Sequence, residues 1–116
     1  MLPSSLKSLG AYSFAESDLE SIEFEAGSCL ERIDEGAFYD SNLRSILIPS
    51  SVQVIGPSAF AESSLEEIKF EAGSRLLMID SEAFLNTNLS SIVIPASAKT
   101  LGDIGVTFEY AARSLC

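Results

Sequence analysis

The feature that most constrains this chain is an internal repeat. The phrase "FAESDLESIEFEAGS" occupies residues 14–28, and a close copy, "FAESSLEEIKFEAGS", occupies residues 60–74. Residues 14–51 and 60–97 are identical at about two thirds of their positions when compared at this shift of 46. Copies that repeat at a fixed period fold alike and bury their apolar residues against one another. The sequence therefore predicts one domain built as a stack of similar coils.

Each long repeat divides into two shorter copies that share an apolar frame. The frame reads Leu-x-x-Ile-x-Phe or Leu-x-x-Ile-x-Ile, and its four copies are residues 19–24, 43–48, 65–70 and 89–94. Its last two apolar residues alternate with polar ones, which predicts a strand with one face turned inward. A second frame, which ends in Ala-Phe, fills residues 30–38, 52–60 and 76–84, and Leu6, Leu9 and Phe14 begin the same series.

Only the turn after each strand varies in length. It is longer where the strand ends in "FEAGS" and shorter where it ends in "IPSS" or "IPAS", so the spacing alternates between 24 and 22 residues. A solenoid must return to the same point after each circuit, which confines length differences to surface turns. We therefore predict a solenoid with a short parallel sheet of about four strands on one face. Irregular, 3-10 or helical returns are expected on the other face.

The repeated frames resemble those of a known family. The phrase "IPSSVQVIGPSAF" at residues 48–60, like the L-x-x-I-x-[FI] strand and the I-x-x-x-A-F return, is similar to BspA-like leucine-rich repeats. These repeats occur in surface proteins of oral bacteria and trichomonads. The resemblance covers about residues 2–97 and implies a leucine-rich-repeat solenoid. It also implies a non-catalytic role in adhesion, at the cell surface, to host matrix proteins or other cells.

The two ends of the chain depart from the regular frame. Residues 2–6 match residues 48–52, so the chain begins partway through a repeat and we expect it to be a piece of a longer protein. We assign residues 1–97 to regular repeats and residues 98–116 to a degenerate terminal repeat. Thr107 is a candidate N-cap, and the apolar residues that follow it at helical spacing predict a short capping helix: Phe108, Ala111, Ala112 and Leu115. Neither a signal-peptide-like stretch nor a membrane-length apolar run is visible.

Charge and motif content narrow the functional classes. Seventeen acidic and seven basic residues give a net charge of -10, which repels nucleic acid and anionic lipid headgroups. The chain has no histidine, and it has no Gly-rich phosphate loop, nucleophile motif or metal-ligand spacing. We therefore expect no enzyme activity, cofactor, bound metal, nucleic-acid partner or membrane insertion. A protein partner is the remaining expectation, and the oligomeric state stays open.

The outer, concave face of the predicted sheet is the candidate partner site. Apolar Leu47 and Val93 alternate there with charged residues across the strands. The candidate partner-binding residues are Glu23, Glu25, Leu47, Glu67, Lys69, Glu71 and Val93. The apolar pair would anchor a partner and the glutamates would select basic side chains. The alternative is that Leu47 and Val93 only favour strand conformation.

Three further questions remain open in the sequence. The protein is either an adhesin-like module that recognises host or cell-surface proteins or an intracellular scaffold or orphan repeat protein. Cys29 should be an exposed turn residue, several repeats away from Cys116 and too far from it for an intrachain disulfide, while pairing between molecules stays open. Asn88 begins a glycosylation sequon, Asn-Leu-Ser, but it fills the same turn position as Asn42.

Overall fold

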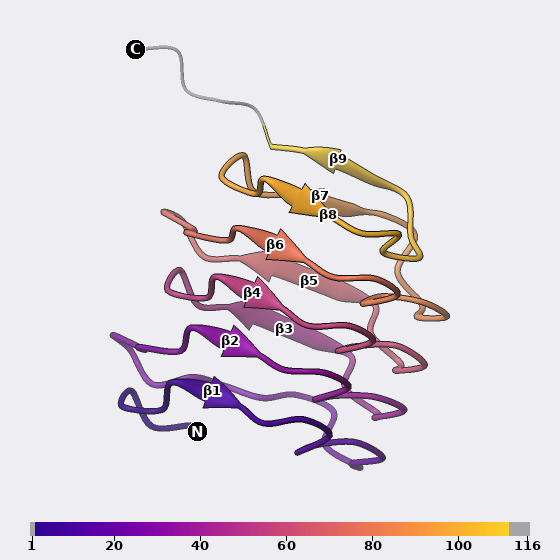
Figure 1. Ribbon diagram of the computed structural model, residues 1–116. Coiled ribbons are helices and arrows are strands. Elements are labelled where there is room, and N and C mark those ends of the chain that lie inside the picture. The colour runs from indigo at the N-terminus through magenta and orange to yellow at the C-terminus, as the bar shows by residue number, and fades with distance from the viewer. Residues whose placement is uncertain (1, 112–116) are drawn as a thin grey trace.

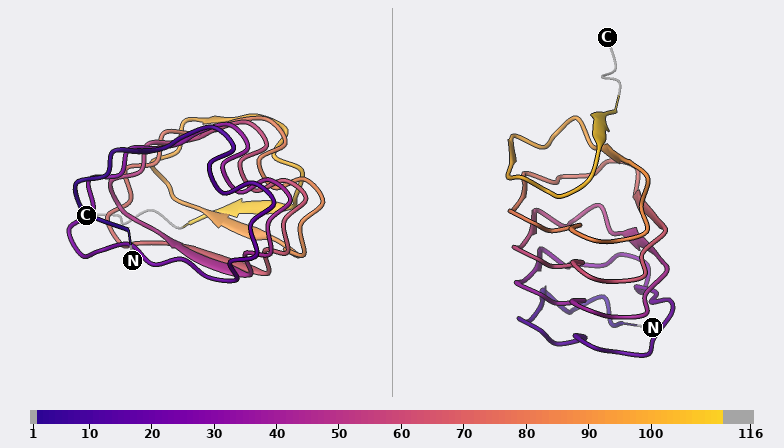
Figure 2. Two further views of the ribbon diagram at one scale, coloured as in Figure 1. Left: turned by 90° about the horizontal axis from the view of Figure 1, so that it is seen from below. Right: turned by 90° about the vertical axis from the view of Figure 1, so that its right-hand side faces the viewer.

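A computed structural model describes residues 2–111 and shows a parallel β-solenoid of about four turns (Figure 1). Viewed along its axis, the coils superpose on one another, as Figure 2 shows. All strand pairs are parallel, as the repeat predicts. The predicted solenoid is therefore confirmed, but residues 2–111 contain no helix, so helical returns are absent from that part of the chain.

The returns on one face form a continuous sheet of five two-residue strands. These are β1 (Ser8–Leu9), β2 (Arg32–Ile33), β4 (Val54–Ile55), β6 (Met78–Ile79) and β8 (Thr100–Leu101), paired in that order. The second apolar frame supplies their buried residues, including Ile33, Ile55 and Ile79. We expected irregular, 3-10 or helical returns; most of each return is irregular, and these two-residue strands were not predicted. Stacked coils bring equivalent backbone segments to strand spacing, where pairing satisfies their polar groups.

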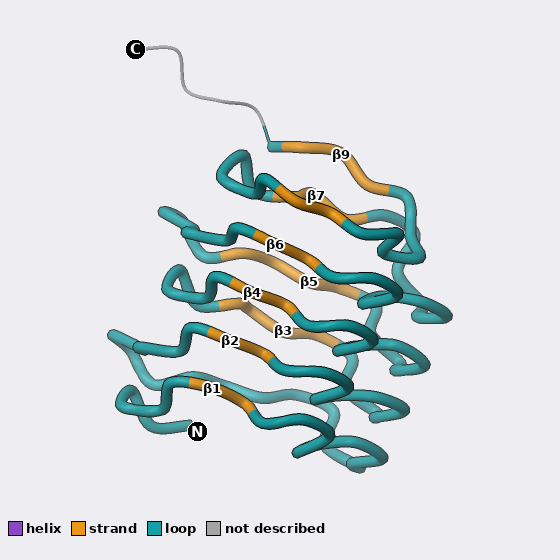
Figure 3. Tube along the Cα trace, in the orientation of Figure 1, coloured by secondary structure: helices purple, strands orange, loops and turns teal. Residues whose placement is uncertain are grey.

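The other face carries an interrupted sheet made of two strand pairs. Strand β3 (Ser45–Ile48) pairs with β5 (Glu67–Phe70), and β7 (Ile92–Ile94) pairs with β9 (Phe108–Tyr110) (Figure 3). Three of these strands lie where the first apolar frame predicts them. The fourth predicted segment, residues 19–24, contributes only isolated bridges, from Ser21 to Ser45 and from Phe24 to Leu2.

A ladder of phenylalanines runs through the core between the two sheets. The rings of Phe14, Phe38, Phe60 and Phe84 stack with centroid separations of 5.4, 5.2 and 5.5 Å and interplanar angles of 9° or less. Main-chain bonds follow the same ladder, since each Phe N–H at positions 14, 38 and 60 donates to the alanine before the next Phe, at 2.7–2.8 Å. Phe14, at the end of the ladder, is half-buried, whereas the other three rings are buried. Each ring therefore covers its neighbour, as the repeat requires.

Two left-handed residues bend each coil around its phenylalanine. They lie two residues before and two residues after the ring, and most of them are not glycine. The pairs are Tyr12 and Glu16, Gly36 and Asp40, Ser58 and Glu62, and Glu82 and Asn86, with φ between 54° and 62°. Such φ values cost free energy for residues with a Cβ. Bonds to the next coil offset this cost, as where Glu62 N donates to Leu85 O at 2.8 Å.

The last coil takes a shorter route than the others. Phe84 N donates to Ile104 O at 2.9 Å, so buried Ile104 stands where the earlier coils have alanine. The chain then crosses directly to β9. The helix expected behind Thr107 does not form over Phe108–Tyr110, because pairing with β7 satisfies that backbone whereas a short isolated helix is marginal. The remainder of the expected helix, residues 112–116, lies outside the described residues.

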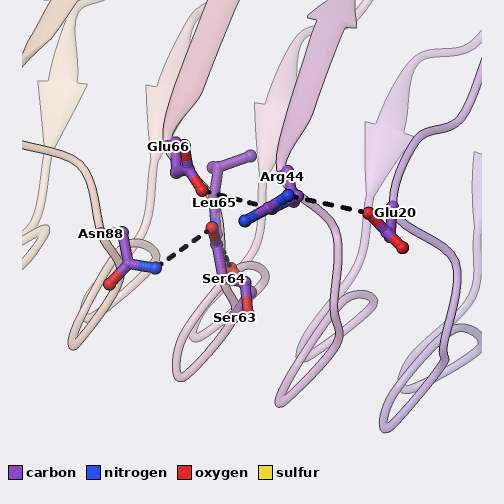
Figure 4. A network of polar contacts seen from close by, with 7 residues as sticks. All are labelled: Glu20, Arg44, Ser63, Ser64, Leu65, Glu66 and Asn88. Carbon is purple, nitrogen blue, oxygen red and sulfur yellow. Dashed lines mark hydrogen bonds and ion pairs between the residues drawn. The ribbon is translucent and has the colours of Figure 1, made fainter.

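Polar contacts tie successive coils together before the strands of the interrupted sheet begin (Figure 4). Arg44 lies between Glu20 and Glu66, with N–O distances of 3.8 and 3.2 Å. Asn88 Nδ2 donates to Ser64 O at 3.4 Å, which ties this turn to the preceding coil. The ion pairs are exposed and each adds little stability. These contacts therefore align the coils more than they stabilise them.

Two glycines provide a test of the coil-on-coil register. A Cβ on Gly56 would lie 2.9 Å from the backbone of Asp34 and Glu35, whereas a Cβ on Gly10, the same position in the first coil, would meet nothing within 4 Å. We predict that Gly56→Ala lowers the free energy of unfolding by about 1–3 kcal/mol through this overlap. Gly10→Ala should change it by less than about 0.5 kcal/mol. Urea denaturation measures both, and equal losses would contradict the stacking described here.

Candidate protein-binding face

All seven candidate residues lie exposed on the interrupted face. Leu47 pairs directly with Lys69 in the ladder, and Val93 pairs with Glu109 of the last strand. The exposed fractions of Leu47 and Val93 are 52% and 51%, which is high for aliphatic residues in the middle of strands. The structure does not gather the seven residues at one point. It distributes them along two openings in the sheet.

The sheet opens because neighbouring strands pair two by two. Within residues 2–111, no main-chain hydrogen bond joins β5 to β7, although β3 pairs with β5 through all four residues. Side-chain burial follows the same alternation. The inward residues of β3 and β7 are buried, whereas the equivalent residues of the coils that end in the long turn are half-buried: Ile22, Phe24, Ile68 and Phe70. The sequence predicted these four as core residues, and their partial exposure is a finding of the structure.

Two grooves occupy the openings. The first groove, of about 380 Å³, lies between residues 22–28 and the strand that contains Leu47. The second groove, of about 720 Å³, lies between β5 and β7. Their linings correspond at the repeat shift of 46 residues: Ile22 and Ile68, Glu23 and Lys69, Phe24 and Phe70, Gly27 and Gly73, Leu47 and Val93, Pro49 and Pro95. Glu71 lines both grooves. The grooves are therefore a repeated feature of the two-coil unit.

The prolines of the short turns explain where pairing stops. Ile48 O accepts a hydrogen bond from Glu71 N at 2.9 Å, on the side of β5. Alternate residues of a parallel strand direct their backbone groups to opposite neighbours, so Pro49 faces the first groove, where it has no N–H to donate. Pro95 occupies the same position beside the second groove.

Glutamates of the long turns reinforce the pairing on the opposite side. Glu71 Oε1 accepts a hydrogen bond from Ser50 N at 2.9 Å, and Glu25 Oε1 accepts one from Ser4 N at 2.8 Å. The bond from Ser4 lowers the pKa of the Glu25 carboxyl, since it stabilises the ionised form. Each long-turn coil is thereby held to the coil before it and left apart from the coil after it.

The interrupted face is acidic, and most of its carboxylates have no basic partner in the described part of the chain. Among the described residues, the salt bridges are Arg32–Asp34, Arg44–Glu20 and Arg44–Glu66, and none of them includes Glu23, Glu25, Glu67 or Glu71. Lys69 is the one basic residue in either lining. Residues 2–111 contain no cluster of side chains suited to hold a metal ion and no helix that could span a bilayer. This chemistry suits recognition of a partner that brings apolar and basic groups.

The family of the chain follows from its repeats. The family described as "BspA type Leucine rich repeat region (6 copies)" matches residues 1–111. The chain belongs to this BspA-type leucine-rich repeat family. The match continues past residue 97, where we expected the regular repeats to end, and includes the shortened last coil. Repeats of this type are typically non-catalytic protein-interaction modules.

Two solved structures share the fold. The pneumococcal vaccine antigen PcpA superposes with a TM-score of 0.87 at 38% sequence identity, over 93% of this chain and 28% of PcpA. A leucine-rich repeat protein from Bacteroides capillosus ATCC 29799 superposes with a TM-score of 0.68 at 27% identity, over 90% of this chain and 86% of that protein. This BspA-type chain thus spans little more than a quarter of PcpA. No curated protein matches it in sequence.

The Glu25 bond predicts a pH dependence of stability. The pKa of this carboxyl lies below its usual value of 4.5, so the ionised group stabilises the fold at neutral pH. That stabilisation is lost as the pH falls from about 4.5 through the lowered pKa. The melting temperature of Glu25→Gln should therefore lie below that of the parent chain at pH 7, and the two should converge once the pH falls below the lowered pKa. A difference that stays constant with pH, as expected for a neutral contact, would contradict this role.

Proposed function

We propose that this BspA-type chain is the recognition module of an adhesive cell-surface protein that binds host or cell-surface proteins, including those of the extracellular matrix. The observation that carries the proposal is the interrupted face, where the same groove recurs in each two-coil unit. Exposed Leu47 and Val93 stand beside these grooves among carboxylates of which, within the described residues, only Glu66 makes an internal salt bridge. Such a face recognises a surface at several points and performs no reaction.

The location at the cell surface is supported by resemblance. The chain is 38% identical to part of PcpA, a pneumococcal vaccine antigen, and a vaccine antigen is normally a molecule that antibodies can reach. The matched region covers 28% of PcpA. An intracellular scaffold could use the same face, so location separates the two functions.

A triple substitution tests the binding face. We predict that Leu47→Ser, Lys69→Ala and Val93→Ser together weaken binding to a panel of purified extracellular-matrix proteins by at least about tenfold. All three side chains are exposed, so the melting temperature should stay nearly unchanged. Leu77→Ser is the matched control, because Leu77 is 43% exposed and lies beside β6 in the continuous sheet. Full binding by the triple variant would remove the interrupted face from consideration.

Antibody labelling of intact cells tests the location. Serum raised against residues 1–111 should label intact cells of the source organism, and permeabilisation should add little signal. Mild protease treatment of intact cells should remove the label. Signal that appears only after permeabilisation would contradict the adhesin proposal and favour the intracellular scaffold.

A further inference from the structure

We infer that the two grooves accept extended peptide segments in which lysine or arginine alternates with apolar side chains. This inference rests on the proposed binding function and names the chemistry of the partner. It is carried by three properties of the grooves: their apolar linings, their uncompensated carboxylates and the unpaired strand edges beside them.

The apolar lining comes from side chains that the fold leaves half-buried. In the second groove, Ile68 and Phe70 reach the opening from one side and Val93 and Pro95 from the other. Its volume of about 720 Å³ lies within the range of small-molecule ligand sites, which is about 300–1,000 Å³. A groove of this size holds several apolar side chains of a segment. In the groove, the apolar side chains of the segment would cover Ile68 and Phe70, as strand pairing already covers Ile46 and Ile48.

The negative charge of the linings favours a partner segment in which lysine or arginine lies next to the apolar side chains. The first groove is lined by Glu23, Glu25 and Glu71 and by no basic residue. The second has Glu66, Glu67 and Glu71 against a single lysine, and of these glutamates only Glu66 is paired, with Arg44. The carboxylates lie on exposed positions at the edges of the grooves, so lysine or arginine could meet them without being buried.

The strand edges favour an extended backbone in the partner. Glu71 N donates to Ile48 O, so Ile68 and Phe70 direct their backbone groups away from β3 and toward the second groove. On the opposite side, Ile94 O accepts from Ala111 N, so Val93 directs its backbone groups toward the same groove. A segment in strand conformation offers matching donors and acceptors, and its side chains alternate between the groove and solvent.

The repeat places two such grooves side by side. They are separated by the β3–β5 pair, which corresponds to two coil steps of about 4.8 Å each. A partner that carries two basic-apolar segments could therefore occupy both grooves at once. Two-point attachment raises affinity well above that of either segment.

Labelled heptapeptides test the inference directly. We expect a peptide of alternating lysine and valine to bind the chain in fluorescence anisotropy, and to shift the amide resonances of Ile68, Phe70 and Val93 in NMR spectra. A glutamate–valine peptide should not bind. A lysine–serine peptide of the same charge lacks apolar side chains and should bind about tenfold more weakly. This peptide controls for simple attraction to the net charge of -10.

Substitutions in the grooves then distinguish binding in the grooves from non-specific attraction to the acidic surface. Leu47→Ser with Val93→Ser should weaken the lysine–valine peptide about tenfold, and Glu67→Gln with Glu71→Gln should weaken it severalfold. The matched controls Leu77→Ser and Glu31→Gln change an apolar and an acidic residue outside both linings and should leave the affinity unchanged. Equal binding of the lysine–valine and lysine–serine peptides, or equal losses in groove and control variants, would overturn the inference.

Failure of this inference can be distinguished from failure of the proposed function. If no peptide binds but the triple variant still loses matrix-protein binding, the peptide chemistry is wrong and the proposed function stands. If the peptide binds in the grooves but the triple variant keeps its matrix-protein affinity, the grooves bind peptides and the matrix proteins bind elsewhere, so the proposed binding face is wrong.

Discussion

The structure depends on each coil covering the apolar flank of the next. A single coil has about six apolar side chains, too few to offset the conformational entropy lost in ordering its backbone. The stacked rings of Phe38, Phe60 and Phe84, with the buried isoleucines beside them, remove this deficit only when several coils are present. The strain of the left-handed turns is tolerated for the same reason, since seven of these eight residues donate a main-chain hydrogen bond to the next coil.

The same stacking becomes a binding surface where it is incomplete. Long and short turns alternate along the chain, and Pro49 and Pro95 withhold a backbone donor at every second interface. The continuous sheet on the opposite face keeps the coils together, so the interrupted face can open without loss of the fold. Apolar residues that would be core in a uniform solenoid are thereby left half-buried at the grooves. Stability and recognition are thus divided between the two faces.

Much of the fold could be predicted from the sequence because repetition fixes burial. Three of the four strands of the first frame, the inward phenylalanines and exposed Cys29 follow from period and position, and the structure confirms them. The return strands could not be predicted, since two-residue strands form only when a neighbouring coil supplies the partner. Strand β9 was missed for a similar reason, because pairing with β7 overrides a helical pattern. The candidate residues lie on the exposed side of the first-frame strands, as the alternation predicts. The grooves between them depend on unequal pairing, which only the alternating turns and prolines indicate in the sequence.

Native-state hydrogen exchange tests the central claim most directly. If the coils stabilise one another, the amides of Phe38 and Phe60, which donate to the next coil at 2.7 and 2.8 Å, should share one opening free energy equal to that of global unfolding. The amide of Phe14, at the end of the ladder, should open at lower cost. Separate values for the amides of Phe38 and Phe60, each independent of the global stability, would mean that the coils persist alone and would contradict the account.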